Sequence, residues 1–113
     1  MTTPALFLRI YHPSIDPQKI TEEFGLPPQT SWAAMGHHKT YWLTRLAGDE
    51  TGRGDLTSAL RDVAARIEHY RFFVDEMREG GGRVEIVIAG TAEKLDAALE
   101  TTFRDLKIAL LFD

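Results

Sequence analysis

The stretch that decides the fold class is LFLRIYHPSIDPQKITEEFG, residues 6–25. Every second side chain in residues 6–11 is aliphatic, which predicts a strand with one apolar face. Asp16 then suits the cap of a helix, Pro17 suits its first position, and Gly25 suits a left-handed residue just after its end. A strand that passes within a few residues into a short helix indicates a domain that contains both kinds of element.

The same two periodicities continue outward along the chain. Alternation predicts three further strands, over residues 39–46, 84–89 and 106–112. Apolar residues at steps of four and three from Leu56 to Met77 predict either one long helix or two helices that break near Tyr70. A one-sided apolar pattern predicts a last helix over residues 92–103, whereas residues 29–36 show no periodicity.

This order predicts a single domain over residues 1–113, a length at which one domain buries enough apolar surface to fold. The elements follow one another as β-α-β-α-β-α-β. Because each helix has one apolar stripe and each strand one strongly apolar face, we expect an α+β two-layer sandwich. A four-stranded mixed sheet would carry the helices on one of its faces.

The second face of this sheet is less polar than a solvated face should be. Arg9 and Glu85 interrupt it, but most of its side chains are apolar. Because apolar patches of this kind mark interfaces, we predict a homodimer contact there, unless the chain's own loops or long helix cover the face. Alternation places either Tyr41 or Trp42 on it, and the predicted contact residues are Phe7, Tyr11, Trp42, Val87 and Leu111.

Composition restricts the possible functions. The formal net charge is −4, which argues against nucleic acid and against an anionic membrane surface as partners. The chain has no cysteine, which excludes disulfides, zinc ribbons and a cysteine nucleophile. A reducing, cytoplasmic location is therefore expected. The longest apolar runs are far shorter than a membrane span, so no membrane insertion is expected either.

No motif indicates a particular reaction, so an enzyme is the less favoured reading and no cofactor is expected. Gly80, Gly81 and Gly82 follow a helix and precede a strand, which is the reverse of a phosphate-binding loop, so they predict a helix stop and a turn. His37 and His38 are adjacent, and neighbouring residues of a strand point to opposite faces. No metal site is therefore predicted.

The loop around Trp32 is the best candidate for a binding site. It places hydrogen-bonding groups beside large apolar ones, as ligand pockets and protein interfaces do. The candidate binding residues there and at the end of the first strand are His12, Asp16, Trp32, Met35, His37 and His38. The alternative is that Trp32 and Met35 only cover the core beneath a long loop.

A family resemblance rests on the segment from Ile15 to Pro28. Its Asp-Pro-x-x-Ile-Thr helix, followed by Gly and a Pro-rich turn, resembles the opening of the bacterial family catalogued as domain of unknown function 4279. Phe24 stands where that family usually has Leu, and Gly36 and Trp42 could match its loop glycine and strand tryptophan. The resemblance implies a small cytoplasmic bacterial protein and carries no assigned activity.

Two functions are compatible with these observations. The leading interpretation is a non-catalytic binding module that forms a homodimer, of which an immunity-type protein that blocks a toxin is one example. The alternative is a small-ligand sensor or small enzyme with its site near the Trp32 loop.

Overall fold

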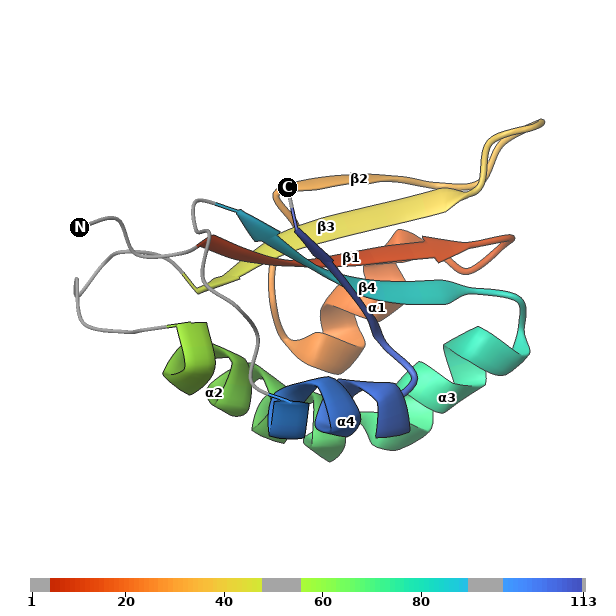
Figure 1. Ribbon diagram of the computed structural model, residues 1–113. Coiled ribbons are helices and arrows are strands. Elements are labelled where there is room, and N and C mark those ends of the chain that lie inside the picture. Colours follow the sequence, from red (N-terminus) through yellow and green to blue (C-terminus); the bar gives the residue numbers. More distant parts are fainter. Residues whose placement is uncertain (1–4, 48–55, 90–96, 113) are drawn as a thin grey trace.

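The computed structural model describes residues 5–47, 56–89 and 97–112. Within these ranges the chain forms five strands and four helices (Figure 1). Their bounds, in chain order, are β1 Ala5–His12, α1 Pro17–Phe24, β2 Thr30–Trp32, β3 Thr40–Ala47, α2 Leu56–His69, α3 Arg71–Glu79, β4 Arg83–Ala89, α4 Ala97–Asp105 and β5 Ala109–Phe112. The expected α+β class and the mixed sheet are confirmed.

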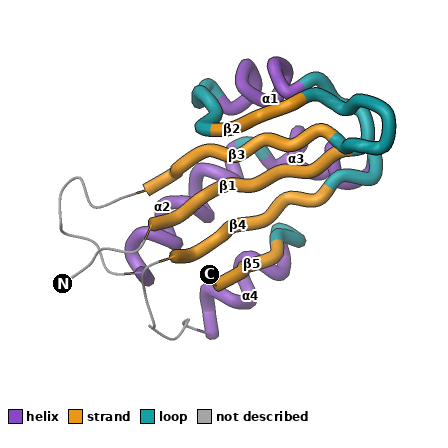
Figure 2. The backbone as a smooth tube through the Cα atoms, turned by 90° about the horizontal axis from the view of Figure 1, so that it is seen from above, coloured by secondary structure: helices purple, strands orange, loops and turns teal. Residues whose placement is uncertain are grey.

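The strands lie in the order β2-β3-β1-β4-β5, with β1 in the centre (Figure 2). β1 is antiparallel to both of its neighbours, β3 and β4, while β5 adds to β4 in the parallel direction. β1 and β2 share a direction because β3 lies antiparallel between them. Strands β1 to β4 therefore have the split β-α-β arrangement.

All four helices lie on one side of the sheet, which forms the second layer (Figure 1). Leu6, Leu8 and Ile10 point from the central strand into this interface and are almost fully buried. They belong to one continuous cluster of buried apolar side chains to which α1, α2, α3 and α4 all contribute. The hydrophobic effect thus holds the helices to one face only.

The sheet has five strands rather than the four expected, and its element order differs accordingly. The additional strand, β2, lies in the segment 29–36 that shows no periodicity. It pairs antiparallel with β3 through only three residues, all of them exposed. A strand of three residues is too short to show alternation. β2 lies on the edge of the sheet, and its pairing with β3, rather than its own sequence, defines it as a strand.

The apolar pattern from Leu56 to Met77 forms two helices, α2 and α3, that meet at Tyr70. Tyr70 has φ −105° and ψ 19°, outside the helical range, and its N–H still bonds the carbonyl of Ile67 at 2.9 Å. The bend buries Phe73 against Phe24 and leaves Phe72 94% exposed. Asp55, which precedes Leu56 and has a side chain suited to a helix cap, lies outside the described residues.

The last strand is shorter than the alternating pattern predicts. Leu106 and Ile108 are buried, but they lie in the turn after α4, where Lys107 has a positive φ of 59°. β5 begins at Ala109. A left-handed residue interrupts an extended backbone, although the alternation of side chains continues through it. The beginning of the expected helix 92–103 lies outside the described residues.

Trp42 corrects one predicted contact of the second face. Its side chain is fully buried on the helix side, where it stacks on Phe24 at 5.8 Å between ring centroids. Tyr41 takes the place on the opposite face. The physical reason is that the buried indole N–H needs an acceptor, and the hydroxyl of Thr21 in α1 provides it at 3.0 Å.

Candidate functional site

The face of the sheet that points away from the helices is the most distinctive surface of the molecule, and we call it the outer face. Strand registers place its side chains in cross-strand rows. Its described members are Ala5, Phe7, Arg9, Tyr11, Thr30, Trp32, Tyr41, Leu43, Arg45, Arg83, Glu85, Val87, Ala89, Ala109 and Leu111. None of the described helices lies over this face (Figure 1).

The first row is aromatic. Trp32 stacks on Tyr41 with ring centroids 4.4 Å apart, and Tyr41 meets Tyr11 at 5.2 Å in a tilted arrangement. Burial raises the pKa of Tyr41, and the neighbouring Tyr11 hydroxyl adds to this effect. Trp32, on the edge strand, remains 49% exposed. The row therefore presents a ridge of rings with an open end at Trp32.

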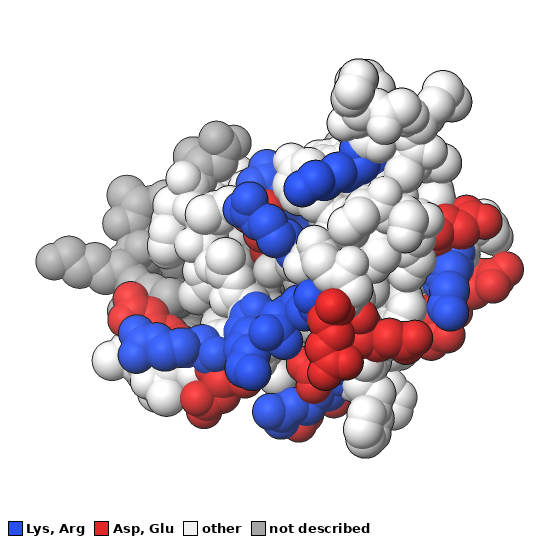
Figure 3. Space-filling view, turned by 90° about the vertical axis from the view of Figure 1, so that its right-hand side faces the viewer, with Lys and Arg blue, Asp and Glu red and all other residues white. Residues whose placement is uncertain are grey.

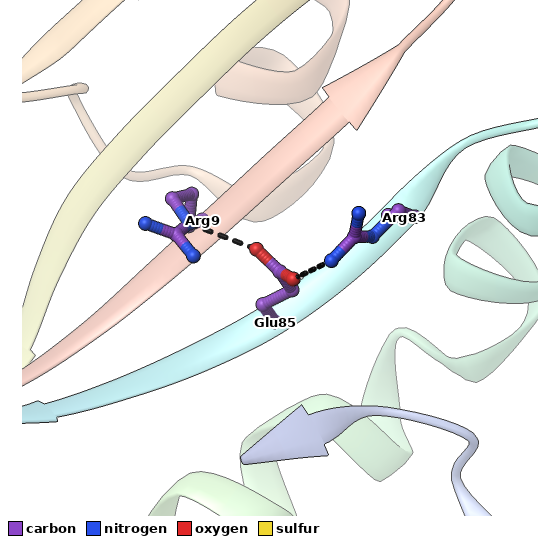
Figure 4. A network of polar contacts seen from close by, with 3 residues as sticks. All are labelled: Arg9, Arg83 and Glu85. Atoms are coloured by element: carbon purple, nitrogen blue, oxygen red, sulfur yellow. Dashed lines mark hydrogen bonds and ion pairs between the residues drawn. The ribbon is translucent and has the colours of Figure 1, made fainter. Parts of the chain in front are cut away.

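The second row contains a buried carboxylate, Glu85, which lies between the guanidinium group of Arg9 in the same row and that of Arg83 in the first row (Figure 4). Glu85 is only 1% exposed, and its Oε1 accepts from Nε of Arg9 at 2.8 Å. Arg83 donates to the other carboxylate oxygen from a side chain that is 70% exposed. The guanidinium of Arg9 also lies 5.6 Å from the ring centroid of Tyr11. This contact has cation–π geometry and links the charged row to the aromatic row.

The third row is mainly apolar. Phe7 lies opposite Val87 on β4, and Val87 lies opposite Leu111 on β5. Phe7 and Val87 are half-buried, and Leu111 is exposed. Arg45 ends this row on β3. With the aromatic row, these side chains form an apolar patch that surrounds a paired ionic centre.

Charge is distributed unequally between the two layers. The outer face carries three arginines and one glutamate, whereas the four helices with the Asp16 cap carry ten acidic and six basic residues. In Figure 3 most acidic side chains lie in the lower half, on the helix side, whereas basic and uncharged side chains predominate on the sheet side at the top. The outer face thus has the opposite sign to the chain as a whole, which is −4.

The candidate residues around the Trp32 loop are not gathered into one site. His12 points to the helix side and is 9% exposed, whereas Trp32 belongs to the outer face. Asp16 caps α1, as predicted, because its Oδ1 accepts from the N–H of Gln18 at 2.9 Å. His37 and His38 are exposed near the tip of the hairpin between β2 and β3.

That hairpin projects beyond the rest of the sheet (Figure 1). Met35 and His38 pair through both backbone hydrogen bonds, and Gly36 between them has a φ of 59°. Met35 is 77% exposed. The alternative that Trp32 and Met35 cover the core is therefore wrong, because neither side chain is buried and the hairpin turns away from the helices.

Sequence reasoning missed the roles of Tyr41 and Arg83. The signal for Arg83 was present, since residues 83 and 85 share one face of any strand and an acidic residue between apolar neighbours needs a basic partner. Tyr41 could not be separated from Trp42 by alternation alone. Within the described ranges, no cluster of three or more His, Cys, Asp or Glu side chains could hold a metal ion.

None of the helices in the described ranges combines the length and the apolar character that a membrane span needs. Comparison with family models, with curated proteins and with solved structures finds no match to this chain. The resemblance of residues 15–28 to the domain of unknown function 4279 therefore stays a prediction.

Proposed function

We propose that this chain is a non-catalytic binding module that pairs with a second copy of itself through the outer face. The observation that supports the proposal is the patch of aromatic and aliphatic side chains on a face that no described helix covers. Contiguous apolar patches of this kind are uncommon on monomers and typical of interfaces. Trp, Tyr and Arg, which form its first two rows, are also the residues enriched at interface hot spots.

The area of the outer face is compatible with a dimer of low affinity. Neighbouring strands lie about 4.8 Å apart and rise about 3.3 Å per residue, so the five strands give a footprint of roughly 500 Å². Two copies would bury roughly 1,000 Å² together, which is the lower bound for a specific interface. We therefore expect a dissociation constant in the micromolar range, about 10 μM.

The ionic centre is compatible with burial in such a contact. Each carboxylate oxygen of Glu85 already accepts a hydrogen bond from an arginine. A second copy that covers the face would therefore not leave this buried charge without a partner. Arg83 is the exposed member of the cluster and lies where it can donate to the second copy. The outer face is nevertheless net basic, so like charges oppose the pairing of two copies and limit its affinity.

The test is the solution mass, measured by light scattering over a range of concentrations. Val87→Lys places a charge in the centre of the apolar row and should abolish the dimer. Phe72→Lys is the matched control, because Phe72 is 94% exposed on α3, on the opposite layer. A monomer at all concentrations, or a dimer lost in the Phe72 variant and kept in the Val87 variant, would exclude the outer face as the interface.

A further inference from the structure

A second surface feature lies on the helix side, where the end of β1 meets α1 and α3. It is a hollow of about 330 Å³, near the lower limit for small-molecule sites. It is separate from the outer face and does not depend on the proposed dimer. The residues that line it are His12, Ile15, Lys19, Phe73, Glu76, Met77 and Gly80.

The imidazole of His12 has a defined orientation in this hollow. Its Nδ1 accepts from the backbone N–H of Ser14 at 3.0 Å and of Ile15 at 2.9 Å. An atom that accepts twice carries no proton, so the neutral ring holds its hydrogen on Nε2. Burial lowers the pKa of His12, which favours this neutral form. Among the described residues, none accepts a hydrogen bond from Nε2.

The glycine run explains how Nε2 stays accessible. A Cβ on Gly80 would lie 2.9 Å from Nε2, and a Cβ on Gly82 would lie 2.9 Å from Cδ2 of the same ring. Gly81 between them has a φ of 94°, which favours glycine for a different reason. The run is therefore more than a helix stop, because two of its members leave room for the imidazole.

The charged residues at the hollow are not paired. Lys19 extends from α1 and Glu76 from α3, and neither makes an ion pair within the described part of the chain. Ile15, Phe73 and Met77 supply an apolar wall, with Met77 almost fully buried. The hollow thus combines a cation, an anion, a neutral N–H donor and apolar surface.

We infer that this hollow binds a small zwitterion with an apolar side chain, of the size of a free amino acid. Its carboxylate accepts from Lys19 and from Nε2–H of His12. Its ammonium group pairs with Glu76, and its side chain contacts Ile15, Phe73 and Met77. Two residues of opposite charge that line one hollow without pairing match a ligand that carries both charges, whereas a simple anion would be repelled by Glu76.

The test is titration of the 113-residue chain with L-leucine, with binding measured by calorimetry and by NMR of the His12 ring. We expect a dissociation constant of about 1 mM or tighter and a rise in the pKa of His12, because a bound carboxylate favours the charged imidazole. Two truncated probes define the recognition: 4-methylpentanoate lacks the ammonium group and isopentylamine lacks the carboxylate. Each should bind about tenfold more weakly.

Matched variants localise the site. Lys19→Gln and Glu76→Gln should each weaken leucine binding about tenfold, while Glu79→Gln, on the same helix but outside the hollow, should leave it unchanged. His12→Asn keeps an acceptor for Ser14 and Ile15 but lacks the Nε2 donor, so it should fold and bind leucine more weakly. Unchanged binding in the Lys19 and Glu76 variants, or no response of His12 to leucine, would overturn the inference.

Discussion

The indole N–H of Trp42 donates to the hydroxyl oxygen of Thr21 at 3.0 Å, and this bond joins the helix α1 to the strand β3 of the sheet. Trp42 is fully buried and stacks on Phe24 of the same helix. Because a buried indole N–H without a partner is costly, the bond helps to decide which of the two neighbouring aromatic residues of β3 faces inward. Tyr41 is thereby left for the outer face.

This relationship predicts the effect of removing the hydroxyl group. Thr21→Val keeps the shape of the side chain but leaves the indole N–H unpaired, so the free energy of unfolding should fall by about 1–3 kcal/mol. Urea denaturation measures the change. Thr21→Ser is the control, because it keeps the hydroxyl and should lose less than half as much.

The ionic centre predicts an unequal effect of its two arginines. Arg9 is 27% exposed and Arg83 is 70% exposed, although both bond to Glu85. Arg83→Ala should therefore cost less than about 1 kcal/mol of unfolding free energy, as for exposed ion pairs. Arg9→Ala should cost about 1–3 kcal/mol, because it removes the better shielded partner of a buried carboxylate. Equal losses in thermal or urea unfolding would contradict this ranking.

His12 predicts a pH dependence of stability. Its pKa is lowered in the folded state below the ordinary 6.5, because burial penalises the charged ring. The folded state therefore resists protonation, and the contribution to stability is complete above about pH 6.5 and is lost as the pH falls through the lowered pKa. His12→Asn cannot titrate in this range. When the free energy of unfolding is measured by urea denaturation between about pH 7.5 and pH 5, it should change less with pH in this variant than in the wild type.

Substitution by alanine should act differently at Gly80 and at Gly36. Gly80→Ala should displace the ring of His12, because the added Cβ would lie 2.9 Å from Nε2. Gly36→Ala meets no atom within 4 Å, so it should cost only the left-handed backbone conformation, about 1–2 kcal/mol. The NMR signals of the His12 ring distinguish the two, since only the Gly80 variant should move them.

The charge of the outer face predicts how salt acts on the proposed dimer. Two net basic faces repel each other, so screening should strengthen self-association between about 0.05 and 0.5 M salt. Light scattering at several salt concentrations measures this. Weaker association at high salt would indicate attraction between unlike charges. The basic outer face of one copy would then contact an acidic surface of the other copy, such as its helix side, and the contact between two outer faces would be excluded.

Local chemistry accounts for the parts of the fold that were predicted correctly. Asp16 accepts from the N–H of Gln18, and Gly25 has a φ of 67°, as the cap and the helix end require. The cap and the helix end each depend only on residues that are neighbours in the sequence. The alternating patterns of β1 and β4 were equally reliable, because burial on one face repeats at the period of the strand itself.

The remaining features depend on partners that are distant in the sequence. β2 exists because β3 supplies its hydrogen bonds, and Arg9 meets Glu85 across 76 positions of chain. The candidate residues His12 and Trp32 are separated by the sheet, which no spacing between them could show. The glycine run after α3 likewise has its reason in His12, at the other end of the sequence.

The sequence by itself determined that this protein is an α+β domain with a well-capped first helix, because those features arise from local periodicity and local hydrogen bonds. The tertiary structure alone decided the strand order, the inward side of Trp42 and the grouping of aromatic and ionic rows on the outer face. Strand pairing joins residues far apart in the chain, and each side chain then faces whichever layer can satisfy its polar atoms and bury its apolar surface.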